Sequence, residues 1–151
     1  MKRLLIICML VVLGNGVFGQ GIEFMDNEPW SKVLQRAKEQ NRLIFMDCYT
    51  VWCGPCKGLA QDVFPQKQVG DFFNAHFVNV KYDMEKGDGK MLREKYKEYI
   101  IGFPTLLLLD GDGNVVHGWL PKGGELDCRN ESGNGGEIIT GLAEKVRGWS
   151  S

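Results

Sequence analysis

Histidine is scarce in this sequence: its 151 residues include two, His76 and His117, and neither has a partner at the spacing of a metal-binding pair. Five cysteines are present, but Cys53 and Cys56 are the one closely spaced pair among them. A structural zinc site needs four ligands, usually supplied as two such pairs. The sequence therefore predicts no metal, and methionines that occur singly suggest no cofactor-binding segment.

Positive charge is not in excess either. Lys and Arg number 18 against 19 Asp and Glu, for a formal net charge of −1, and the basic residues form no cluster. Nucleic acids and anionic membrane surfaces are bound through concentrated positive charge, so we expect neither as a partner. Internal repeats and coiled-coil heptads are also lacking, which favours one ordinary globular domain.

Long apolar runs are absent beyond Leu4–Leu13, which follows Lys2 and Arg3 and precedes a stretch of small residues. About ten apolar residues fall short of the roughly 20 that a membrane-spanning helix needs, so a membrane anchor is the less favoured alternative. The pattern is typical of a cleavable secretory signal peptide over residues 1–19. We therefore expect an exported, periplasmic or otherwise extracytoplasmic protein whose single domain, residues 20–151, keeps no stable membrane insertion.

The paired cysteines lie in a context typical of redox chemistry. A strand-like run, Leu43–Tyr49, precedes Trp52-Cys53-Gly54-Pro55-Cys56-Lys57, and a helical pattern follows. Two cysteines at this spacing can close a small disulfide if the first caps a helix and the second lies one turn in. Unpaired N–H groups at such a helix start favour a thiolate at Cys53, and proline is tolerated in a first turn.

Two segments of the sequence resemble the thioredoxin family. Asp47 to Lys57 is similar to its active-site segment, which has an acidic residue, five residues, and then Trp-Cys-Gly-Pro-Cys-Lys. Gly102-Phe103-Pro104-Thr105, followed by Leu106–Leu109, is similar to its second signature, the cis-proline loop and the strand after it. From Leu43 to about Trp119 the chain is most similar to thioredoxin-like domains of bacterial envelope proteins, such as the C-terminal domain of DsbD-type electron transporters.

The resemblance implies a thioredoxin fold, an α/β architecture with a mixed central sheet and helices on both faces. It also implies a sheet order in which the strands near residues 77, 43, 105 and 115 follow one another, three of them parallel and the last antiparallel. Hydrophobic periodicity and turn residues predict the same elements. They are a helix from an Asn27 cap to Asn41, an active-site helix broken at Pro65, a helical pattern that resumes near Val69, strands at 77–82, 106–109 and 115–119, helices at 91–99 and from about 137, and an inserted surface loop over 120–136.

The resemblance also assigns chemical roles. Cys53 would attack a substrate disulfide as a thiolate, and Cys56 would resolve the mixed disulfide. Asp47 matches the family's buried acid, which would exchange a proton with Cys56; the alternative is a solvated carboxylate at a strand end. Lys57 either favours the thiolate or is simply a solvated lysine.

Substrate contact is expected around the same loop. Trp52 and Phe103 would flank the cysteines as an apolar docking surface, beside the Gly54-Pro55 dipeptide that matches the reductant branch of the family. Pro104, if its peptide bond is cis, would leave the backbone of Phe103 open to strand-like pairing with a substrate peptide.

The other cysteines and the histidines have less definite roles. Cys48 follows Asp47 on the opposite face of the strand and is expected to be a small buried residue. Cys128 is either an unpaired thiol in the loop or a partner for Cys48. His76 and His117 are expected at the surface.

These features together predict an envelope thiol-disulfide oxidoreductase, a reductase of protein disulfides that acts through Cys53 and Cys56. Its partners would be protein disulfide substrates and an envelope electron donor of the membrane-transporter type, because an exported dithiol needs a source of electrons. Two alternatives remain. One is a binding module with vestigial cysteines, and the other is a maturation factor for one dedicated cytochrome or metalloprotein.

Overall fold

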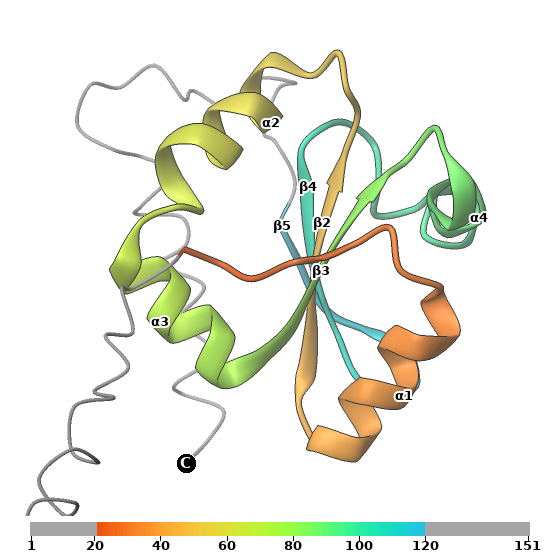
Figure 1. The fold of residues 1–151 in the computed structure, drawn as a ribbon. Helices are drawn as coiled ribbons and strands as arrows, with labels where there is room; N and C mark the ends of the chain where they lie inside the picture. The colour runs from red at the N-terminus through yellow and green to blue at the C-terminus, as the bar shows by residue number, and fades with distance from the viewer. Residues whose placement is uncertain (1–20, 120–151) are drawn as a thin grey trace, which may run out of the picture.

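The computed structural model describes residues 21–119, which form a five-stranded sheet with helices on both faces (Figure 1). The predicted signal peptide, the loop 120–136 and the final helix lie outside the described residues. The elements, in chain order, are β1 (Met25–Asp26), α1 (Trp30–Gln40), β2 (Leu43–Tyr49), α2 (Gly54–Gly58), a π-helical turn (Leu59–Val63), α3 (Lys67–His76), β3 (Phe77–Asp83), α4 (Gly87–Lys95), β4 (Thr105–Leu109) and β5 (Val115–Trp119). No helix in this part of the chain is both long enough and apolar enough to span a bilayer.

The strand order is β1-β3-β2-β4-β5, so the predicted order of the four main strands is confirmed. The predicted strand directions are wrong in one respect. β4 runs antiparallel to β2, and β5 runs antiparallel to β4, so β4 and not β5 is the reversed strand. The register explains this: Cys48 at the end of β2 lies opposite Thr105 at the start of β4. Only a reversed β4 brings the loop before it to the edge of the sheet where β2 ends.

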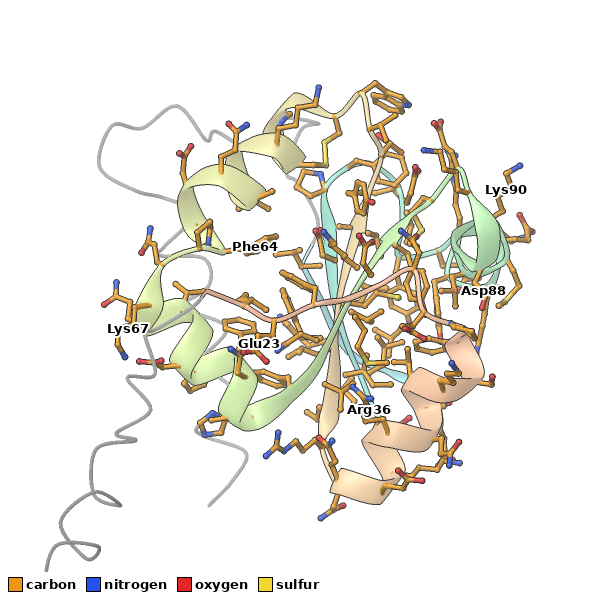
Figure 2. The ribbon with its side chains drawn as sticks, in the orientation of Figure 1. Glu23, Arg36, Phe64, Lys67, Asp88 and Lys90 are labelled. Atoms are coloured by element: carbon orange, nitrogen blue, oxygen red, sulfur yellow. A yellow bond between two sulfur atoms is a disulfide. The ribbon has the colours of Figure 1, made fainter. Side chains whose placement is uncertain are left out.

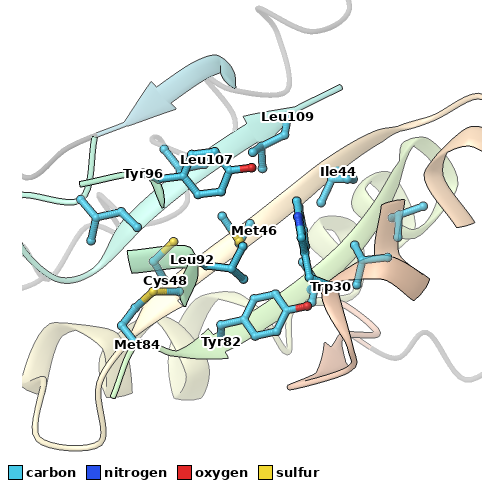
Figure 3. Packing of buried hydrophobic residues seen from close by; sticks show 14 of the residues in the cluster. Trp30, Ile44, Met46, Cys48, Tyr82, Met84, Leu92, Tyr96, Leu107 and Leu109 are labelled. Atoms are coloured by element: carbon cyan, nitrogen blue, oxygen red, sulfur yellow. The ribbon is translucent and has the colours of Figure 1, made fainter. Parts of the chain in front are cut away.

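Side chains alternate between the two faces of the sheet, and each face has its own core. Ile44, Met46 and Cys48 point to the face covered by α1 and α4, where they pack with Trp30, Tyr82 and Leu92 (Figure 3). Phe45 points to the other face, under α2 and α3, and contacts several rings at centroid distances of 4.6 to 6.4 Å. Asp47 is two residues from Phe45 and therefore lies on the α2 face.

Helix α1 begins later than its local sequence predicts. Asn27 was expected to cap it, but Asn27 has a left-handed backbone (φ 49°), and its side-chain oxygen accepts a hydrogen bond from the backbone N–H of Asp83 (3.1 Å). The helix starts at Trp30, whose N–H donates to the carboxylate of Asp88 at 2.8 Å. A residue 58 positions away therefore satisfies the free N–H at the start of the helix.

Helix α4 also differs from the prediction: it spans Gly87–Lys95, whereas a loop over 87–89 and a helix over 91–99 were expected. Gly89 lies against the end of β3, and a Cβ atom there would come within 2.0 Å of the Asp83 carbonyl oxygen. Glycine is therefore needed inside the helix for close packing, which its turn-like sequence does not reveal. The break of the active-site helix at Pro65 is confirmed, since α3 begins only at Lys67.

Candidate active site

The two paired cysteines lie at the start of α2 and form a disulfide, with an S–S distance of 2.08 Å and Cα atoms 5.3 Å apart. Cys53 caps the helix, and Cys56 lies in its first turn, as the spacing predicted. The backbone N–H of Cys56 points at the sulfur of Cys53, with 3.1 Å between N and Sγ. The same contact in the reduced protein would stabilise a thiolate on Cys53.

Both cysteines are nearly enclosed, with 3% of Cys53 and 6% of Cys56 exposed. The dipeptide between them is not held by packing in the same way. A Cβ atom on Gly54 would meet no atom within 4 Å, and Pro55 is only half-buried. Lys57, at the next position, is exposed. The residues between and after the cysteines are therefore available to a docking partner.

The loop before β4 lies beside the Cys53–Cys56 disulfide because β2 and β4 are paired. The peptide bond between Phe103 and Pro104 is cis, as the resemblance implied. The ring of Phe103 meets the indole of Trp52 edge to face, with centroids 5.9 Å apart. Trp52 is 63% exposed and directly precedes Cys53, so the two aromatic side chains form an accessible rim next to the Cys53–Cys56 disulfide.

Glu85 is a member of this rim that the sequence analysis missed. The indole N–H of Trp52 lies 3.1 Å from each oxygen of the Glu85 carboxylate. Glu85 follows β3, and no motif joins it to Trp52, which lies 33 residues away. Only the parallel pairing of β2 with β3 brings the two loops together, so sequence spacing offers no signal for this contact.

Asp47 is buried, with 5% of its surface exposed, so the alternative of a solvated carboxylate at a strand end is wrong. Burial raises its pKa to about 7, although the positive charge of Lys81, its neighbour across the sheet, opposes that rise. Its Oδ1 atom has no hydrogen-bond partner among residues 21–119. A buried carboxyl group of this kind is ready to take up or release a proton near neutral pH.

An open groove of about 590 Å³ connects this acid with the dithiol. Asp47, Cys56 and Lys57 all line it, together with Thr50, whose buried hydroxyl has no hydrogen-bond partner in the described part of the chain. The groove runs beneath α2 and is polar where these residues meet. It offers a route for protons between Asp47, Cys56 and solvent.

The remaining candidates that the structure describes lie away from this site. Cys48 is fully buried on the α1 face, where burial raises the pKa of its thiol, so its predicted role as a small core residue is confirmed. Cys128 lies outside the described residues. His76 is exposed at the end of α3, and His117 is half-buried on β5. Among residues 21–119, no three His, Cys, Asp or Glu side chains cluster as metal ligands would.

Residues 26–111 match the family model described as thioredoxin-like, which covers more than half of the chain. The chain is 43% identical over 99 residues to thioredoxin H4 of Arabidopsis thaliana, covering 65% of this chain and 76% of that protein. It is 29% identical over 82 residues to the thiol:disulfide interchange protein DsbD of Pseudomonas fluorescens. That match covers 54% of this chain but only 14% of the relative, and the match to DsbD of Pseudoalteromonas atlantica covers 15%.

Solved structures agree with these relatives. A putative disulphide-isomerase from Bacteroides thetaiotaomicron shares 45% sequence identity and a TM-score of 0.60, with 68% of this chain and 83% of that chain covered. A disulphide isomerase from Xylella fastidiosa has 25% identity and a TM-score of 0.60, covering 78% and 87%. The chain therefore belongs to the thioredoxin-like family, and its Cys53–Cys56 disulfide lies within the residues that match the family model.

Proposed function

We propose that this protein is an exported reductase of protein disulfides. The observation that carries the proposal is the placement of the buried acid Asp47 in the same groove as Cys56, beneath a dithiol whose first cysteine accepts a backbone N–H. A reductase needs an attacking thiolate and a second thiol that becomes nucleophilic only after the first bond has formed. The two cysteines occupy environments that suit these two tasks.

The reaction follows from this arrangement. The Cys53 thiolate attacks one sulfur of a substrate disulfide, and the other substrate sulfur leaves as a thiolate. Cys56 then gives its proton to the Asp47 carboxylate and attacks the Cys53 sulfur, which releases the second substrate thiolate. The substrate gains two electrons, and the enzyme is left with the Cys53–Cys56 disulfide, the form present in the structure.

Export and the electron supply belong to the proposal as well. The expected signal peptide over residues 1–19 supports an envelope location, where the Cys53–Cys56 disulfide must be reduced again after each cycle. The likeness to DsbD, a thiol:disulfide interchange protein, supports an electron donor of the membrane-transporter type. A fusion of residues 1–30 to alkaline phosphatase tests export, because that reporter becomes active only outside the cytoplasm.

The direction of transfer is tested by the equilibrium reduction potential of the Cys53/Cys56 pair in glutathione buffers. The Gly54-Pro55 dipeptide predicts a value near the roughly −270 mV of thioredoxin. A potential above about −180 mV, in the range of protein disulfide isomerase, would contradict the reductase assignment. It would favour an oxidase or an isomerase, and the likeness to the putative disulphide-isomerase from Bacteroides thetaiotaomicron supports the isomerase.

A turnover assay separates general reduction from service to one dedicated partner. We expect the protein to reduce insulin disulfides when dithiothreitol supplies the electrons. A reducing potential without insulin turnover would instead support the maturation factor for a single cytochrome or metalloprotein. Failure of both measurements would leave a binding module.

A further inference from the structure

We propose that Arg93 selects substrates whose disulfide is flanked by acidic residues, an inference that rests on the proposed disulfide exchange at Cys53. Its guanidinium carbon lies 5.3 Å from the centre of the Phe103 ring, within the range of a cation–π contact. Phe103 in turn contacts Trp52, which is joined to Cys53. The cation of Arg93 is therefore linked to the cysteine pair through the contact between Phe103 and Trp52.

Arg93 is exposed on α4 and has no carboxylate partner among residues 21–119. Three of the acids near it in the sequence already have partners. Asp83 pairs with Lys86, Glu94 pairs with Lys97, and the carboxylate of Asp88 accepts the N–H of Trp30. The guanidinium donors of Arg93 are therefore available to a carboxylate that arrives with a substrate.

Lys90 adds to this positive charge. It lies three residues before Arg93, at the spacing that places two side chains on one face of a helix, and it is exposed without a described ion pair. Figure 2 shows Lys90 projecting outward from α4 in the half of the molecule that carries α2. The apolar part of the docking surface, Trp52 and Phe103, is thus bordered by cations on its α4 side.

The overall charge of the protein would not produce such a preference. The formal net charge is −1, and a Cys53 thiolate and the Glu85 carboxylate would both repel an acidic peptide. Any preference for acidic substrates must therefore come from local cations, and Arg93 is a cation that contacts the Phe103 ring of the docking surface. A stacked guanidinium is well suited to this because it can bind a carboxylate through two N–H groups at once.

The test uses the Cys56→Ser variant, in which the Cys53 thiolate attacks a peptide disulfide and remains joined to one peptide half. Three disulfide peptides are compared that differ only in the two residues beside the cysteine, which are aspartates, asparagines or lysines. Rates of mixed-disulfide formation are followed by mass spectrometry. This reaction measures substrate docking at Cys53 whether the protein acts as a reductase or as an isomerase.

We expect the aspartate peptide to react about threefold faster than the asparagine peptide, and the lysine peptide to react more slowly than both, as for one partly exposed charge pair. Arg93→Gln should remove the preference for aspartate over asparagine, and Arg93→Glu should reverse it. The preference should also shrink in about 1 M salt, where charges are screened beyond about 3 Å.

The matched controls are Arg36→Gln and Arg36→Glu. Arg36 is exposed on α1, far from α2 in Figure 2, and no ion pair involves it within residues 21–119. These variants change the net charge as the Arg93 variants do, so they should leave the peptide preference unchanged. An equal loss in both sets would mean that net charge, and not Arg93, sets the preference.

Two failures would be distinguishable. If insulin is reduced but the three peptides react at one rate, Arg93 does not select substrates. The inference is then refuted, while the proposed reductase function stands. If neither insulin nor any peptide reacts, the proposed exchange at Cys53 is itself wrong, and the inference falls with it.

Discussion

Replacing Asp47 with asparagine should stabilise the fold, and by an amount that depends on pH. Burial raises the pKa of this carboxyl group from 3.8 to about 7 in the folded protein. The folded protein therefore holds a proton over a pH range in which the unfolded chain has already released it, so the fold loses stability as the pH rises from about 4 to about 7. At about 1.4 kcal/mol for each pH unit, the loss reaches about 4 kcal/mol above pH 7.

Asparagine remains neutral throughout this range, so the variant should not show that loss. A buried amide without partners has its own cost of about 1–3 kcal/mol, but the neutral acid that it replaces carries a similar cost. The gain in the free energy of unfolding should therefore be near zero at pH 4 and about 2–4 kcal/mol at pH 8. Urea unfolding of the oxidised protein at several pH values measures it.

The control is Asp71→Asn, which removes an exposed carboxylate that pairs with Lys67 on α3. It should change the free energy of unfolding by less than about 1 kcal/mol. If Asp47→Asn changed the free energy of unfolding equally at pH 4 and at pH 8, the pKa of Asp47 would be the same in the folded and the unfolded protein. The argument from burial would then be wrong.

Three further predictions concern other parts of the molecule. Cys53→Ser should abolish turnover, whereas Cys56→Ser should trap mixed disulfides with client proteins. The trapped species appear on gels as bands that dithiothreitol removes, and the opposite pattern would reverse the two roles. Phe45→Ala should lower the free energy of unfolding by about 3–4 kcal/mol in urea, since this fully buried ring packs among other aromatic rings; a loss below about 1 kcal/mol would contradict that. Glu85→Ala should raise the KM for insulin with little change in kcat, because it frees the indole of Trp52, and a changed kcat alone would show that Glu85 acts otherwise.

Asp47 should also affect the kinetics of disulfide exchange. Asp47→Asn should slow the resolution of the mixed disulfide by Cys56 and flatten its pH dependence, because the proton acceptor in the groove is lost. The first attack by Cys53 should change much less. Stopped-flow measurements between about pH 5 and pH 9, a range that brackets the Asp47 pKa, separate the two steps. Resolution that kept its rate and its pH profile would show that another group takes the proton.

Features encoded by neighbouring residues were predicted well. The strand β2, the cap at Cys53, the break at Pro65 and the buried strand β4 all follow from local patterns of apolar, glycine and proline residues, and the structure confirms them. The burial of Asp47 followed from its position inside an apolar strand.

Features that depend on distant residues were missed. The start of α1 is set by Asp88, and the orientation of Trp52 is fixed by Glu85, each more than 30 residues away. The two-residue strand β1 is too short to show a pattern and exists because it pairs with β3. The direction of β4 was wrong because an apolar run carries no information about orientation, although the proximity expected for Phe103 and Trp52 already required the reversal.

The pairing of Cys48 with Thr105 also bears on how this protein can diverge or be engineered. Residues paired across an antiparallel ladder have Cα atoms about 4.5–5.5 Å apart whatever the chain does between them. The distance between the cysteine pair and the cis-proline loop is therefore set by the pairing of β2 with β4, and not by the connections between them. Insertions in exposed connections that do not line the groove can alter the outer surface while leaving this pairing in place. Such a connection is where a peptide tag or a sensor domain could be introduced.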